Sequence, residues 1–169
     1  DIEWKARGPR KARLAKAPSI DEGIEFLRGA KGTKLLMVPG LQLPAKFSAA
    51  SCLYIWRIPT ELPRGNEEVR IKIFDQWDDV SPFREVQRRS WGFFVEPRPG
   101  DHLIILAELG ERPVGVAYLN RRNFNLDYGV HVVRDMWRRR VGTRIMREAL
   151  ELAEGLGARY VTVVRWIRR

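Results

Sequence analysis

The chain has 169 residues, which is enough for one domain with a real core and a smaller appendage. Its 31 Lys+Arg against 21 Asp+Glu give a formal net charge of +10, which favours an anionic partner such as a nucleic acid or a phosphorylated cofactor. One cysteine excludes an intramolecular disulfide framework, and two histidines beside it do not suffice for a structural zinc site. Because no apolar run approaches the roughly 18 residues of a membrane span, we expect a cytoplasmic protein with neither membrane nor metal partner.

The N-terminal residues 1–18 contain six basic and two acidic residues and almost no large apolar ones. This composition is typical of a solvated, flexible tail, and the alternative is an arm that binds nucleic acid. We expect a small helix-plus-strands extension to follow over 19–67. Its helix is predicted by the capping-box pattern that begins at Ser19, and its other elements are strands at 34–38 and 52–58 and a linker at 60–66.

From residue 68 to 169 the signals of secondary structure are stronger. Apolar residues alternate with charged ones over 69–73, which predicts a half-buried strand, and Ser81-Pro82 predicts the capped start of a helix. The later elements are a hairpin of strands at 102–108 and 114–119, a strand at 126–133, a helix from Gly142, and a strand at 159–164 that should be buried on both faces. This order predicts an α/β (α+β) fold, a mixed central sheet with flanking helices and an N-terminal extension.

The loop between the strand at 126–133 and the next helix is the strongest indication of chemistry. The first N–H groups of a helix lack partners, and its dipole is positive there, so such a loop attracts anions. Here the loop reads WRRRVGT at 137–143, and residues 134–147 contain six arginines. Backbone amides, dipole and guanidinium groups would meet a phosphate together. The alternative is that Arg138, Arg139 and Arg140 form only a solvated turn.

The segment LDYGVHVVRDMWRRRVGTRIMREAL resembles the signature of the GNAT superfamily of N-acetyltransferases, a strand followed by Gln/Arg-x-x-Gly-x-Gly/Ala and a helix. The resemblance extends over roughly 68–169 and implies an acetyltransferase-like core. Two positions depart from the signature. Trp137 stands at the Gln/Arg position, and Arg140 stands at the first glycine, whereas Gly142 is retained.

The family normally continues after the buried strand with another helix and two strands, which often carry a tyrosine that acts as general acid. Two arrangements would supply such elements here. The protein continues past Arg169, or residues 1–67 take over part of the role in a permuted order.

The resemblance also implies roles for individual residues. The backbone of Val132 and Val133 would pair with the pantetheine arm of acetyl-CoA like an added strand. The pyrophosphate would be held by the backbone amides of the loop, contributed by Arg138, Arg139, Arg140, Val141, Gly142 and Thr143.

An acceptor amine must lose a proton before it attacks a thioester, so a base is required at neutral pH. Asp127 falls at the family's position for that carboxylate. On strand alternation Asp127, Gly129 and His131 share one face, so His131 is a rival base. In the ordinary interpretation Asp127 is a polar strand-end residue and His131 a packed histidine.

The sequence therefore predicts transfer of an acetyl group from acetyl-CoA to a primary amine, with the amine belonging to a small molecule or a protein. The alternative is a catalytically degenerate acetyltransferase fold that binds nucleic acid or a ribosome through its basic residues. The net charge, the glycine lost at Arg140 and the absent tyrosine segment favour that alternative.

Overall fold

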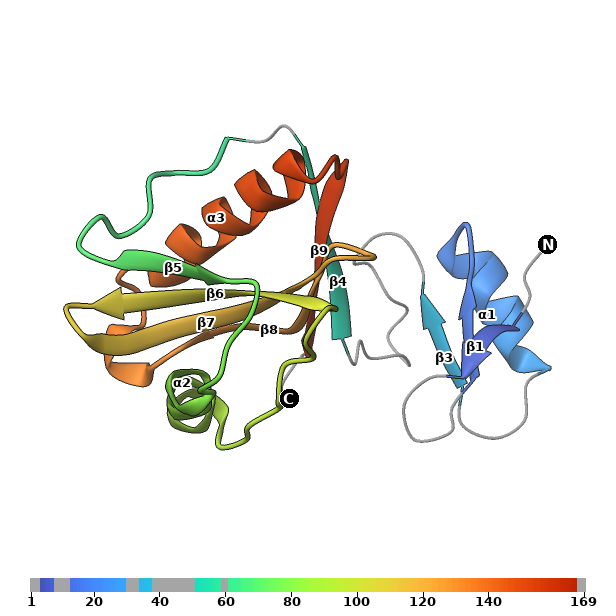
Figure 1. The fold of residues 1–169 in the computed structure, drawn as a ribbon. Coiled ribbons are helices and arrows are strands. Elements are labelled where there is room, and N and C mark those ends of the chain that lie inside the picture. Colours follow the sequence, from blue (N-terminus) through green and yellow to red (C-terminus); the bar gives the residue numbers. More distant parts are fainter. Residues whose placement is uncertain (1–3, 8–12, 30–33, 38–50, 59–60, 167–169) are drawn as a thin grey trace. The chain divides into compact units, whose positions relative to one another are not determined.

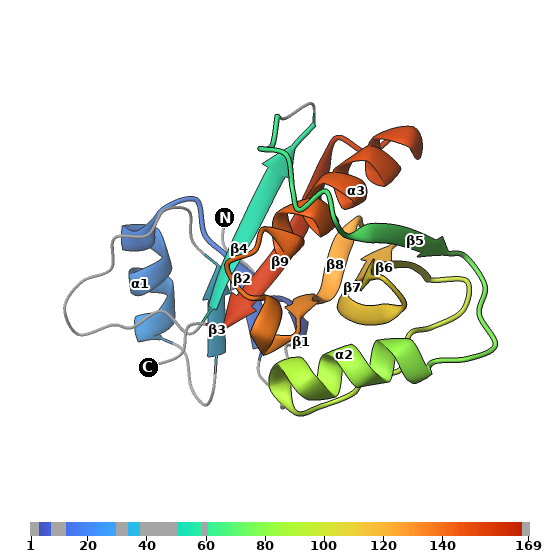
Figure 2. The same cartoon turned by 90° about the vertical axis from the view of Figure 1, so that its left-hand side faces the viewer.

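The computed structural model describes residues 4–7, 13–29, 34–37, 51–58 and 61–166. The chain divides into two compact units, Asp1–Ala49 and Ala50–Arg169. Figures 1 and 2 together label the helices and strands of each unit.

The first unit is a three-stranded sheet with one helix. Its elements are β1 (Trp4–Arg7), β2 (Arg13–Lys16), α1 (Ile20–Arg28) and β3 (Lys34–Met37). β2 pairs antiparallel with β1 and parallel with β3, so α1 belongs to the crossover between two parallel strands. The N-cap predicted at Ser19 is confirmed, because the Glu22 amide donates to Ser19 Oγ over 3.3 Å, and Ser19 Oγ donates to the Glu22 carboxylate over 3.1 Å.

The prediction of a flexible tail over 1–18 is wrong, since β1 and β2 both lie within it. Strands of four residues are too short to show a period, and here they exist through pairing with each other and with the distant strand β3. A local count of charged residues cannot reveal such a partner.

The second unit is a six-stranded mixed sheet in the order β4-β9-β8-β7-β6-β5. Its strands are β4 (Ser51–Arg57), β5 (Arg70–Phe74), β6 (His102–Leu109), β7 (Arg112–Asn120), β8 (Asn125–Val132) and β9 (Tyr160–Trp166). All neighbours are antiparallel except β8 and β9, which run parallel with α3 in their crossover. The mixed central sheet with flanking helices is thus confirmed.

Two helices cover the two faces of this sheet. α2 (Ser81–Trp91) packs on β7 and β8, whereas α3 (Val141–Gly155) packs on β6 to β9. Figures 1 and 2 show them on opposite sides of the sheet. Because antiparallel partners share a face, the pairs His102↔Asn120 and Tyr118↔Asp127 place these four side chains together on the α2 face.

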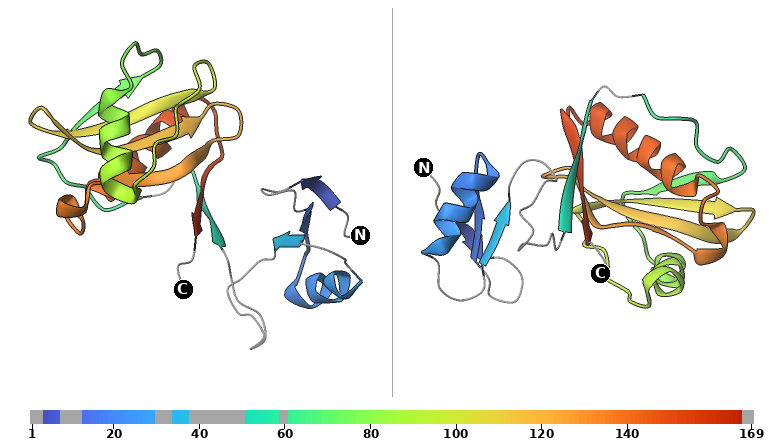
Figure 3. Two further views of the ribbon diagram at one scale, coloured as in Figure 1. Left: turned by 90° about the horizontal axis from the view of Figure 1, so that it is seen from below. Right: turned by 180° about the vertical axis from the view of Figure 1, so that it is seen from behind.

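β4 extends the sheet beyond β9, with which it pairs from Ser51↔Trp166 to Arg57↔Tyr160 (Figure 3). The boundary expected at residue 67 is therefore misplaced, since residues 51–57 belong to the sheet of the second unit. A strand that precedes the core in sequence thus lies beside β9, the last strand of the core.

Two further expectations need correction. The strand at β9 is not buried on both faces: Val161 is fully buried, but Tyr160 is 48% and Val164 41% exposed. Neither of the sheet's two helices covers the α2 face at β9, because α2 packs on β7 and β8. Ser81 does not cap α2 but is its first residue, and its amide donates to Asp79 Oδ1 over 2.9 Å.

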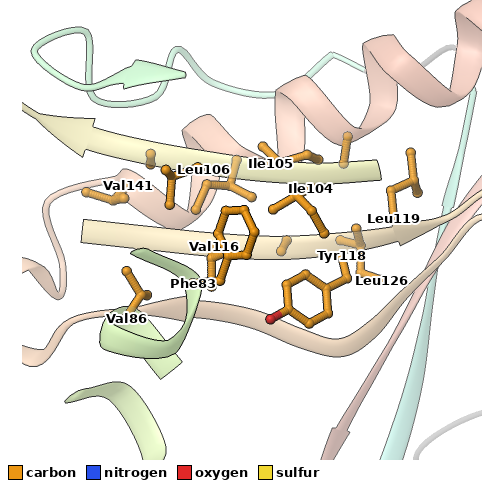
Figure 4. Packing of buried hydrophobic residues seen from close by; sticks show 14 of the residues in the cluster. Phe83, Val86, Ile104, Ile105, Leu106, Val116, Tyr118, Leu119, Leu126 and Val141 are labelled. Atoms are coloured by element: carbon orange, nitrogen blue, oxygen red, sulfur yellow. The ribbon is translucent and has the colours of Figure 1, made fainter. Parts of the chain in front are cut away.

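The core lies on both faces of β6, β7 and β8. On the α2 face Phe83 and Val86 pack toward Tyr118, and on the α3 face Ile105 packs toward Val141 (Figure 4). All five side chains are at most 1% exposed. Burial of this size holds β8 and the first turn of α3 against rigid neighbours.

Candidate active site

The loop between β8 and α3 has an unusual backbone. After a 3-10 turn at Arg134–Met136 the chain is extended at Trp137, and both Arg138 and Arg140 adopt left-handed φ values of 61° and 60°. A non-glycine residue in this region costs about 1 kcal/mol or more, so its neighbours must hold it there. A left-handed conformation, which glycine adopts without this cost, is thus imposed on Arg140 by its surroundings.

Asn66 and Gly65 supply that support. The Asn66 side-chain amide donates to the Arg139 carbonyl over 2.9 Å, and its backbone N–H donates to the Arg140 carbonyl over 3.1 Å. A Cβ added to Gly65 would lie 2.4 Å from the Arg144 Cα, so only glycine lets this segment approach α3. Gly65 and Asn66, which belong to the segment expected to be a linker, therefore support the loop, and we call this pair its buttress. Its sequence carried only turn signals, and no local signal reveals a contact across 73 residues.

The start of α3 offers positive charge and open space. Val141, Gly142 and Thr143 are its first residues, and their N–H groups have no intrahelical acceptor. A Cβ added at Gly142 would meet nothing within 4 Å. Arg138 and Arg140 are exposed, and neither forms an ion pair with any residue that the structure describes. This is the donor set that a pyrophosphate needs, so the residues present fit the phosphate portion of coenzyme A.

β8 separates from β9 early in the strand, well before this loop. The two strands pair only at Asn125↔Thr162 and Leu126↔Val163. Tyr128 and Gly129 are then inserted between the pairs Tyr118↔Asp127 and Ala117↔Val130, both with positive φ, and form a bulge. Bulges bend the strand that carries them, so beyond Gly129 β8 has β7 on one side and an open edge toward β9.

At the open edge of β8, the backbone groups of Val132 point outward, whereas those of Val133 do not. The Val133 N–H donates to the Val114 carbonyl over 2.9 Å and is therefore engaged with β7. Backbone groups alternate along a strand, so those of Val132 point the other way. Its carbonyl accepts a hydrogen bond from Trp137 Nε1 over 2.8 Å. Of the two residues expected to pair with pantetheine, only Val132 has the required orientation.

Asp127 stands at the beginning of the bulge and is held from three strands. Its Oδ2 accepts from His102 Nε2 over 2.8 Å and from Asn120 Nδ2 over 3.0 Å, and its Oδ1 accepts from Asn125 Nδ2 over 2.8 Å. Thr162 Oγ1 in turn donates to Asn125 Oδ1 over 2.8 Å, which links the network to β9. Burial, the largest effect, raises the pKa of Asp127, but the hydrogen bonds from His102, Asn120 and Asn125 together outweigh it and lower the pKa below its usual value.

His102 is fully buried and has a fixed tautomer. Its Nδ1 accepts the Arg98 backbone N–H over 2.8 Å, so the proton lies on Nε2 and is donated to Asp127. Asp127 is thus an ionised carboxylate whose lone pairs are engaged, which makes it a weak base.

His131 lies beyond the bulge on the same face. Its Nε2 donates to the Tyr128 carbonyl over 2.7 Å, so Nδ1 is the acceptor for the Ser90 hydroxyl at 3.3 Å. Its ring packs on Trp91 with centroids 4.3 Å apart. Burial lowers the pKa of His131, more than the hydrogen bond to Tyr128 raises it, and at neutral pH the imidazole carries no charge.

The expected face of Asp127 and His131 is therefore correct, because the bulge adds two residues and keeps the alternation in phase. The network partners His102, Asn120 and Ser90 were not expected, and no periodicity singles them out. Among the described residues no group of three or more acidic, histidine or cysteine side chains could hold a metal ion, and no helix is long and apolar enough to cross a membrane.

The chain is similar to known proteins in its fold and in its sequence family. The structure is similar, with a TM-score of 0.55 and 12% sequence identity, to a functionally unknown conserved protein from Staphylococcus epidermidis, over 94% of this chain and 75% of that one. At this identity the likeness concerns the fold alone. No curated protein matches the sequence. The model of the Acetyltransferase (GNAT) family matches residues 66–166, from the buttress at Asn66 through β9, and the chain therefore belongs to the GNAT family of acetyltransferases.

Proposed function

We propose that this protein transfers an acetyl group from acetyl-CoA to a primary amine. The observation that carries the proposal is the open start of α3, with Gly142 and two exposed arginines, which follows the part of β8 that is not paired with β9. A family acetyltransferase needs a thioester donor, and a phosphate site joined to an open strand edge suits the two ends of coenzyme A. Bound acetyl-CoA would supply an acyl group activated as a thioester.

Each part of the site contributes one function. Arg138, Arg140 and the amides of Val141 to Thr143 would bind the pyrophosphate, and the outward backbone of Val132 would pair with the pantetheine arm. Asn66 keeps the loop in its left-handed conformation. Such preorganisation matters because placing amine and thioester together supplies much of the rate.

Of the two bases that the sequence suggested, we assign proton removal to His131 and positioning of the bulge to Asp127. His131 is uncharged at neutral pH, and its Nδ1 faces the partly exposed hydroxyl of Ser90. A proton from the amine can pass through that hydroxyl to Nδ1. The Asp127 carboxylate already accepts three hydrogen bonds and has a lowered pKa, so it gains little by accepting a proton.

Titration calorimetry with acetyl-CoA tests the donor site. We expect binding by the wild type, and binding about 10-fold or more weaker in the double variant Arg138→Gln/Arg140→Gln, because charge-assisted contacts to the phosphates are removed. Arg147→Gln is the matched control: Arg147 lies within α3, pairs with Glu151 at 3.9 Å, and its replacement should leave binding normal. Absence of binding at millimolar acetyl-CoA, or equal affinity in all three proteins, would contradict the proposal.

The base assignment is tested by thiol release from acetyl-CoA with a panel of primary amines. Because the pKa of His131 is lowered, kcat/KM should stay level from neutral pH down past about 6.5, the ordinary histidine value, and fall only below it. His131→Gln should lower kcat by about 100-fold and remove this decline, while acetyl-CoA still binds. If Asp127→Asn abolished the decline and His131→Gln kept it, the roles would be reversed.

A further inference from the structure

We propose that the Trp137 indole covers the backbone carbonyl of Val132, the hydrogen-bond acceptor with which acyl-CoA would pair. The indole must then turn away when acyl-CoA binds, which makes Trp137 a determinant of the affinity for acyl-CoA. The inference rests on the proposed function, because it concerns the same strand edge. Trp137 stands where the family has Gln or Arg, so this feature belongs to this chain.

The indole occupies a ligand's place on β8. Trp137 Nε1 donates to the Val132 carbonyl over 2.8 Å, on the side of β8 that does not face β7. By the alternation of backbone groups, the outward carbonyls of β8 beyond the bulge are those of Val130 and Val132. An amide N–H of a strand-like ligand that pairs with Val132 needs the same oxygen and the same space as the indole, so indole and ligand compete there.

The side chain has the freedom to leave. Trp137 is 53% exposed, and its indole is held by the hydrogen bond to the Val132 carbonyl. Its backbone N–H donates separately to the Arg134 carbonyl over 3.2 Å, within the 3-10 turn. The Arg139 and Arg140 carbonyls that follow accept hydrogen bonds from Asn66, and that of Arg140 also from the Arg144 N–H of α3, so rotation of the indole does not require this part of the loop to move. The phosphates can thus bind first and the indole can be displaced second.

The consequence is measurable in affinity. A net hydrogen bond contributes about 0.5–1.5 kcal/mol, which corresponds to roughly 2- to 12-fold in a binding constant. Trp137→Phe removes the N–H and keeps an aromatic side chain, so this variant should bind coenzyme A within that range more tightly than the wild type. Trp91→Phe is the matched control for affinity, since Trp91 Nε1 likewise donates to a backbone carbonyl, that of Phe93 at 2.8 Å, outside the loop.

Calorimetry and indole ¹H–¹⁵N spectra with coenzyme A test the inference together. The cross-peak that disappears in Trp137→Phe identifies its indole N–H, and in the wild type that peak should shift upon addition of coenzyme A. Tighter binding by Trp137→Phe, with an unchanged Kd in Trp91→Phe, supports the inference. Binding of coenzyme A to Trp137→Phe that equals or is weaker than wild type, or an unmoved Trp137 peak at saturation, overturns it while the donor site stands. If coenzyme A binds to no variant, both the donor site and the role of Trp137 are refuted.

Discussion

Replacement of Asp127 by Asn tests whether this carboxylate is a structural anchor of the bulge. The substitution keeps the shape and removes the charge. Asn125 can turn its side-chain amide over, because the Thr162 hydroxyl both donates and accepts, so no donor needs to face another donor. The variant therefore measures the loss of charge alone.

The magnitude follows from the three hydrogen bonds that Asp127 accepts. Each changes from a bond to a charged group to a neutral bond, a loss of about 1 kcal/mol, which totals about 3 kcal/mol. The side chain is only 18% exposed, so solvent compensates little. A loss of this size lowers the Tm by roughly 10 °C for a domain of this length. Asp135→Asn is the control: its partner is Arg112 at 2.7 Å, its side chain is 54% exposed, and we expect no clear loss of stability because solvent screens the pair.

The effect should depend on pH with a definite sign. The pKa of Asp127 is lowered in the folded state, so its stabilisation is present above the unfolded value of about 3.9 and is lost as the pH falls through the folded pKa. In urea unfolding, the difference in the free energy of unfolding between wild type and Asp127→Asn should be fully present at pH 7 and become progressively smaller below about pH 4. A difference below about 1 kcal/mol at pH 7, or one that persists unchanged at about pH 2, would refute the anchoring role.

Three other substitutions probe the loop and the sheet. Gly142→Ala should leave the Tm unchanged or raised, since its Cβ meets nothing within 4 Å, yet weaken acetyl-CoA binding in calorimetry by filling the space above α3; equal affinity would argue against a cradle there. Gly65→Ala places a Cβ 2.4 Å from the Arg144 Cα and should cost about 1–3 kcal/mol in urea unfolding, together with weaker acetyl-CoA binding; a wild-type unfolding curve would show that the segment is not a buttress. Glu108→Gln weakens the bond to Lys72 at 2.9 Å and should lower the free energy of unfolding by about 1 kcal/mol, measured by thermal unfolding in low and high salt. A loss above about 3 kcal/mol would mean that the pair is less solvated than the exposure of Lys72 indicates.

Local sequence patterns were sufficient for the strands and helices that carry long periodic runs. The strand β5 and the helix α3 lie where alternation and three-to-four spacing predicted them, and the hairpin of β6 and β7 lies close to its predicted bounds. The shorter β1 and β2 were missed, because four residues show no period and depend on a distant partner. The same reason explains β4, whose strand was predicted but whose place beside β9 was not fixed by its own residues.

In the candidate site, too, some features could be predicted from local sequence and others depend on tertiary contacts. Arginines before a helix, with Gly142 in the first turn, indicate an anion site from sequence, because helix dipole and charge are local properties. Whether Asp127 is a base or an anchor depended on donors from β6, β7 and β8, which tertiary pairing brings together.

The sequence by itself determined the family, the arginine-rich loop and the face shared by Asp127 and His131, since each depends on residue order and on backbone periods of two and 3.6. Only the tertiary structure decided that Asn66 supports the loop, that Val133 faces β7 and that Trp137 lies on the edge of β8. These facts depend on which strands are neighbours and on where a bulge bends one of them. Such contacts join residues far apart in the chain, and their energy does not reside in any one segment.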